Sequence, residues 1–70
     1  MASNLTATDK KAILEFGKEM CVNAFQTYEK TGNGANTIAF DLLGSGYYKK
    51  HSQYTYAGDR MINAGRKLKI

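Results

Sequence analysis

The clearest pattern in the sequence is a series of apolar and small side chains that recur every three or four positions in the first half of the chain. The series comprises Ile13, Phe16, Gly17, Met20, Cys21, Ala24, Phe25 and Tyr28. This spacing gathers them on one face of a helix and leaves charged and amide side chains on the other. Thr6 or Thr8 can cap this helix, and Gly32 suits the left-handed position after its last turn. The pattern predicts one long amphipathic helix over residues 8–30.

A shorter helix is predicted after residues 31–35, a stretch rich in glycine and asparagine that is typical of a turn. Asn36 suits the N-cap position because its side chain can accept a hydrogen bond from the first turn. The apolar side chains that follow on one side are Ile38, Leu42 and Leu43. The glycines of residues 44–46 then end the pattern, which predicts a short helix over residues 37–43.

The last part of the chain repeats large and small side chains with a spacing of seven. The large members are Tyr47, Tyr54, Met61 and Leu68. The small members are Ala57, Gly58, Ala64 and Gly65. Two glycines inside a helix cost about 1 kcal/mol each, so their presence favours a helix that another helix approaches closely. We predict a third helix over residues 47–67, and leave open a break near Gln53 because Tyr54 to Tyr56 alternates like a strand.

Together these elements predict an all-α protein, a small three-helix bundle. It forms one domain over residues 1–70, with a frayed N-terminus over residues 1–7. A chain of 70 residues buries only about 60% of the surface that its unfolded form exposes, so its core is small. A second copy would enlarge that core, and the sequence therefore leaves open a homodimer.

The positive charge of the chain lies in its second half. The formal net charge is +4, and residues 1–35 sum to zero. This asymmetry favours an anionic partner for the second half. No apolar run is long enough to span a membrane, and the N-terminus lacks the features of a signal peptide. Because the sequence also holds a single cysteine, Cys21, we expect a cytoplasmic protein that does not bind membranes.

The most unusual stretch is residues 47–56, in which four of the five tyrosines stand beside two lysines and the only histidine. Tyrosine is favoured at protein interfaces because it offers a large contact area at low entropic cost. Rings beside ammonium groups also bind single-stranded nucleic acids, by stacking on bases and meeting phosphates. Purely structural roles stay open, with Tyr47 and Tyr54 in the core and the C-terminal cations complementing a helix dipole. With the basic C-terminal run added, the candidate partner-binding residues are Tyr47, Tyr48, Lys49, Lys50, Tyr56, Arg66, Lys67 and Lys69.

Templates for catalysis, metals and cofactors fit the sequence poorly. One histidine and one cysteine cannot build a zinc site of the usual spacing. The glycines of residues 31–35 and 44–46 lack the lysine and hydroxyl residues of a phosphate-binding loop. Cys21 lies on the apolar helix face, where we expect a buried, unreactive thiol. These points predict a non-enzymatic protein with no cofactor and no metal.

We therefore expect a small interaction protein, acting as a regulator, an inhibitor or an assembly component. It would bind a partner macromolecule through its basic, tyrosine-rich surface. The partner would be a protein with an acidic surface or a nucleoprotein, because opposite charges speed encounter. The alternatives are a sequence-nonspecific nucleic-acid-binding protein and, further, capture of a small anionic ligand such as a nucleotide. A compact accessory protein of the kind that phages encode would have this size and charge.

Overall fold

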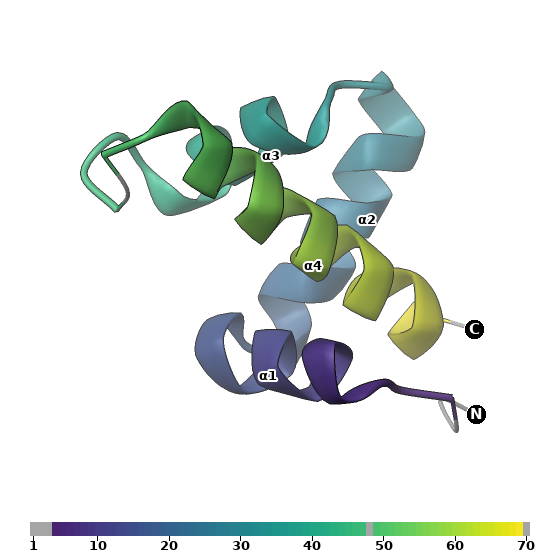
Figure 1. The fold of residues 1–70 in the computed structure, drawn as a ribbon. Helices are drawn as coiled ribbons and strands as arrows, with labels where there is room; N and C mark the ends of the chain where they lie inside the picture. The colour runs from purple at the N-terminus through teal and green to yellow at the C-terminus, as the bar shows by residue number, and fades with distance from the viewer. Residues whose placement is uncertain (1–3, 48, 70) are drawn as a thin grey trace.

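The computed structural model of this chain describes residues 4–47 and 49–69. These residues form four α-helices: α1 (Ala7–Phe16), α2 (Lys18–Thr31), α3 (Ala35–Leu43) and α4 (His51–Lys69). Figure 1 shows α4 crossing the molecule in front of α2, and α4 packs against each of the other three helices. The predicted all-α class is confirmed, whereas the predicted number of three helices is wrong.

The predicted helix over residues 8–30 is two helices, because the backbone bends sharply at Gly17. This residue has φ 90° and ψ 152°, a conformation that is readily available only to glycine. Its N–H donates to the carbonyl of Ile13 at 2.8 Å and ends α1, while its own carbonyl accepts from the N–H of Cys21 at 3.1 Å and begins α2. The bend turns α1 back so that it lies along α4.

Two ion pairs attach α1 to α4 in an antiparallel orientation. Near the start of α1, the carboxylate of Asp9 pairs with the ammonium group of Lys67. At its end, Glu15 Oε1 lies 3.1 Å from Arg60 Nη1. The side chain of Thr6 caps α1 by accepting the N–H of Asp9 at 3.1 Å, and Asp9 accepts the N–H of Thr6 in return at 2.9 Å. Helix α1 is therefore fixed to α4 at both of its ends.

The core lies where α4 meets α2 and α3, and it depends on glycine. Its buried members are Ala12, Cys21, Ala24, Ile38, Ala39, Tyr54, Ala57, Met61, Ile62 and Ala64. A Cβ atom at Gly58 would overlap the backbone of Ala35, and one at Gly65 would overlap the backbone of Cys21. The small residues of α4 therefore allow both neighbouring helices to approach closely, as the sequence pattern predicts.

The boundaries of the last two helices differ from the predicted ones. Helix α3 begins at Ala35 after Gly34, so Asn36 is not its cap, and the Asn36 side chain instead lies 2.7 Å from Nε2 of His51. Helix α4 begins at His51 rather than at residue 47 and runs without a break to Lys69. The alternation at residues 54–56 therefore does not interrupt the helix, and Tyr47 belongs to the connection before it.

Candidate functional site

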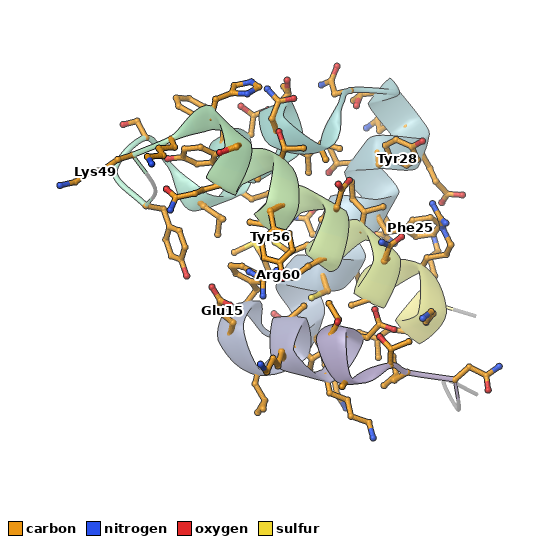
Figure 2. The ribbon with its side chains drawn as sticks, in the orientation of Figure 1. Glu15, Phe25, Tyr28, Lys49, Tyr56 and Arg60 are labelled. Atoms are coloured by element: carbon orange, nitrogen blue, oxygen red, sulfur yellow. The ribbon has the colours of Figure 1, made fainter. Side chains whose placement is uncertain are left out.

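Five side chains meet where α4 passes the end of α1, and we call them the Arg60 cluster: Glu15, Phe16, Tyr47, Tyr56 and Arg60. The guanidinium carbon of Arg60 lies 5.2 Å from the ring centroid of Phe16 and 4.6 Å from that of Tyr56. Only 10% of the Arg60 side chain is exposed, so these attractions act in partly dehydrated surroundings. Figure 2 shows Glu15, Arg60 and Tyr56 together at this crossing.

Glu15 connects two members of this cluster through its two carboxylate oxygens. Its Oε1 atom pairs with Arg60, and its Oε2 atom accepts a hydrogen bond from the hydroxyl group of Tyr47 at 3.2 Å. The Tyr47 ring also packs against Phe16, with centroids 6.1 Å apart and planes inclined by 47°. The connection before α4 is therefore held to the end of α1 by the same residue that binds Arg60.

The two tyrosines of the cluster remain open to solvent although they are held in place. Tyr47 is 45% exposed and Tyr56 is 61% exposed. Each ring has one side or edge against the cluster, so it keeps one orientation while its remaining surface faces solvent. Among the described residues the buried Nε atom of Arg60 has no hydrogen-bond partner. The guanidinium group is therefore held in position by its ion pair with Glu15 and by the rings of Phe16 and Tyr56. This arrangement offers a fixed aromatic surface to a partner.

The predicted lysines Lys49 and Lys50 are exposed in the connection just before α4. Within residues 4–47 and 49–69, neither lysine forms an ion pair. Figure 2 shows Lys49 projecting away from the helices at the N-terminal end of α4. Tyr48, which the sequence also singles out, lies outside the described residues. The charge of the two lysines is therefore available to a partner.

The three predicted cations at the C-terminal end of α4 contact other parts of the chain. Lys67 pairs with Asp9, and Lys69 Nζ lies 3.9 Å from Glu29 Oε1. The guanidinium carbon of Arg66 lies 5.5 Å from the ring centroid of Phe25. An α-helix rises about 1.5 Å per residue, so α4 separates these cations from the Lys49 and Lys50 pair by roughly 25 Å. The structure brings Tyr47 and Tyr56 together around Arg60 and places the two basic groups at opposite ends of α4.

The sequence pattern does not reveal the other three members of the Arg60 cluster. Glu15 has the spacing of a solvated position, and Phe16 has the spacing of a core position. Arg60 is separated from Glu15 by 45 positions, so no local pattern links them. The one readable signal is the spacing of four between Tyr56 and Arg60, which places both on one helix face.

Two surface hollows lie away from the Arg60 cluster. An open groove of about 450 Å³ is lined by Lys18, Glu19, Val22, Asn23, Gln26 and Leu68. A smaller hollow of about 160 Å³ is lined by Asn36, Thr37, Phe40, His51 and Tyr54. Among the described residues, the titratable side chains that line these hollows are Lys18 and Glu19 in the first and His51 and Tyr54 in the second.

Three further findings bear on function. In the part of the chain that the structure describes, no three His, Cys, Asp or Glu side chains gather closely enough to hold a metal ion. None of the described helices combines the length and the apolar character needed to cross a membrane. No family model, no curated protein and no solved structure matches this chain. Function must therefore be inferred from the geometry of the chain itself.

Proposed function

We propose that this chain is a non-enzymatic protein-binding module, a regulator, an inhibitor or an assembly component. Its contact surface is the Arg60 cluster together with Lys49 and Lys50. The observation that supports this most is that Tyr47 and Tyr56 are exposed and yet held around a largely buried arginine. Tyrosine and arginine supply much of the binding energy at protein interfaces, and rings that are fixed before binding lose less entropy on association.

The charge of this surface favours an acidic protein as the partner. Glu15 neutralises Arg60 within the cluster, so Lys49 and Lys50 carry the positive charge that a partner would meet. An acidic patch on the partner would speed encounter and orient the two proteins. The lysines would then contribute to the association rate, whereas Tyr56 would contribute to the lifetime of the complex.

Nucleic-acid binding is less well supported than protein binding. Lys67 is paired with the buried carboxylate of Asp9, so its charge is already neutralised within the chain, whereas Lys69 and Glu29 form only a weak, exposed pair. Lys49 and Lys50 alone would contact few phosphates, and affinity for nucleic acids grows with the number of phosphates neutralised. Nucleic-acid binding therefore remains an alternative outcome of the test.

The test compares binding by matched variants. Native partners are captured on the immobilised chain, identified, purified and then titrated against each variant. Tyr56→Ala should weaken the complex at least tenfold, as expected for an interface anchor, while Tyr28→Ala, which truncates an exposed tyrosine on α2, should leave affinity unchanged. Equal effects of the two substitutions would contradict the proposed surface.

A lysine pair and a nucleic-acid titration complete this test. Replacing Lys49 and Lys50 with glutamine should slow association more than the same replacement of Lys10 and Lys11, which are exposed on α1. Labelled single-stranded and double-stranded DNA and RNA are titrated in parallel at about 50 and 200 mM salt. Micromolar binding that weakens steeply between these salt concentrations would favour the nucleic-acid alternative.

We also propose that the protein works in the cytoplasm and can pair with a second copy. Its single cysteine, Cys21, is buried, and no disulfide stabilises this small core, which suits a reducing compartment. Pairing would add buried surface to a chain of 70 residues.

A further inference from the structure

One residue, Gly17, separates α1 from α2. The helical hydrogen bonds reach this glycine from both sides, through the carbonyl of Ile13 and the N–H of Cys21. Between Ala7 and Thr31, every residue except Gly17 lies in a helix. A change of φ and ψ at this single residue would therefore join α1 and α2 into one straight helix over residues 7–31.

The straight form would satisfy backbone groups that the bent form leaves without helical partners. At the start of α2 no side chain caps the helix, so the N–H groups of residues 18–20 have no helical acceptor. In a straight helix these groups would bond to the carbonyls of residues 14–16. The apolar spacing of the sequence also continues through Gly17 without a shift. Local preferences therefore favour the straight form, and the tertiary contacts of α1, most of them with α4 and the rest with α2, favour the bent one.

A straight chain would leave the surface of α4 that α1 covers without its partner. Arg60 and Lys67 would lose Glu15 and Asp9, and the surface around Ala12, which is fully buried in the bent form, would open. The partner that fits this surface must carry two acids at the spacing of Asp9 and Glu15 on an amphipathic helix. A second copy of this chain carries that helix.

We propose that α1 exchanges between two copies of the chain. In the exchanged dimer each chain has a straight helix over residues 7–31, and its α1 segment docks on α4 of the other copy. Every contact between α1 and α4 is retained, and the hydrogen bonds at residues 18–20 are gained. The cost is the association of two chains, so protein concentration and the residue at position 17 set the equilibrium.

This exchange would build the Arg60 cluster from two copies. Glu15 and Phe16 would come from one chain, while Tyr47, Tyr56 and Arg60 would come from the other. The geometry of the tyrosine surface would be the same in the monomer and in the dimer, but the dimer would present it twice. The exchange therefore does not depend on the proposed binding of an acidic protein, and either could fail without the other.

The direct test is the substitution Gly17→Ala. Beyond Gly17 itself and its two neighbours in the chain, no heavy atom lies within 4 Å of the added Cβ atom, so alanine meets no other part of the protein. It disfavours only the φ of +90° and favours the straight helix. Gly44→Ala is the matched control, because Gly44 has a φ of +86° and is equally open, but it does not join two helices.

The expected result is a dimer specific to position 17. Light scattering after size exclusion, from about 10 µM to about 1 mM, should give Gly17→Ala a dimer dissociation constant at least tenfold lower than that of the unchanged chain. Gly44→Ala should associate no more than the unchanged chain. A Gly17→Ala variant that stays monomeric throughout, or a Gly44→Ala variant that dimerises equally, would overturn the proposal.

A charge-exchange pair tests where α1 docks. One chain carries Glu15→Arg and the other carries Arg60→Glu, so each alone places like charges at the α1–α4 contact. In an exchanged heterodimer both contacts regain opposite charges. Native mass spectrometry of an equimolar mixture should give a heterodimer at least tenfold in excess of either homodimer, and a mixture without this excess would show that α1 does not dock across copies. The pair is measured both in chains that carry Gly17→Ala and in chains that retain Gly17, so that the result does not depend on the folding of the alanine variant.

Discussion

Asp9 and Lys67 form an ion pair that joins the first turn of α1 to the last turns of α4, across 58 positions of the sequence. Asp9 is only 3% exposed, whereas the side chain of Lys67 is 33% exposed. Burial raises the pKa of the Asp9 carboxyl, but hydrogen bonds from Lys67 and Thr6 lower it by more. The pKa of Asp9 therefore lies below its ordinary value of 3.8.

This shift predicts a loss of stability in acid. Because the pKa is lower in the folded chain, the unfolded chain takes up a proton first as the pH falls below 3.8. The stabilisation is complete above that pH and declines as the pH falls through the folded pKa. Asp9→Asn should lower the unfolding free energy by about 2 kcal/mol at pH 7. Urea titrations of the variant and of the unchanged chain at pH 7 and near pH 3 test this. The difference in unfolding free energy between the two proteins should be smaller near pH 3, and an equal difference at both pH values would contradict the prediction.

The glycines of α4 give a second prediction. An added methyl group at Gly58 or Gly65 would overlap the backbone of α3 or α2, so Gly58→Ala and Gly65→Ala should each lower stability by about 1–3 kcal/mol. The matched control is Gly46→Ala, because Gly46 has open space around it and its φ does not lie in the left-handed region. It should change stability by about 0.5 kcal/mol or less. Thermal and urea unfolding measure all three, and equal costs would mean that the close approach is absent.

Apolar spacing predicts most of the helical residues, but it does not predict the bend at Gly17. A glycine inside a helix costs only about 1 kcal/mol, so a continuous helix over residues 8–30 is the locally consistent interpretation. The contacts that hold the chain bent include those of Asp9 with Lys67 and Glu15 with Arg60, beside the burial of Ala12. They join residues far apart in the sequence, and no local pattern contains them. The later start of α4 has a similar origin, because Tyr47 is held by Glu15 outside the helix.

The Glu15–Arg60 pair should be worth more than an exposed pair. Glu15→Gln would leave an arginine side chain that is only 10% exposed without its carboxylate, and we expect a loss of about 1.5–3 kcal/mol. The comparison is Glu29→Gln, because Glu29 and Lys69 are 3.9 Å apart with side chains 54% and 45% exposed. That loss should be about 0.5 kcal/mol or less. A double-mutant cycle of Glu15→Gln with Arg60→Met measures the coupling, and a coupling near zero would refute it.

The candidate site is predictable from the sequence only in part. Tyr47 and Tyr56 can be identified as candidates because aromatic and basic residues are concentrated in residues 47–56. The cluster that holds them depends on Arg60 and Glu15, whose spacing suggests only surface positions. The sequence does not show how its two basic groups lie relative to each other, because that depends on the continuous helix α4, which places them at its opposite ends.

Cys21 gives a chemical prediction. Burial raises the pKa of its thiol. The nearby charge of Arg60 opposes this increase, whereas the charge of Asp9 adds to it, and the pKa is raised overall. A raised pKa and an exposure of 0% both reduce the amount of reactive thiolate. Labelling by iodoacetamide at pH 8 should be at least about a hundredfold slower for the folded chain than for the chain in urea. Comparable rates would mean that the contact between α2 and α4 opens readily.

Site-specific photo-crosslinking tests the proposed interface most directly. A photoreactive phenylalanine analogue is placed at Tyr56 in one sample and at Tyr28 in a second, and both are irradiated with the native partners. The interface around Arg60 predicts a discrete protein adduct at position 56 that an excess of the unlabelled chain removes and an excess of Tyr56→Ala does not. An adduct that forms equally at position 28, or one that Tyr56→Ala removes just as well, would contradict a protein interface at the Arg60 cluster.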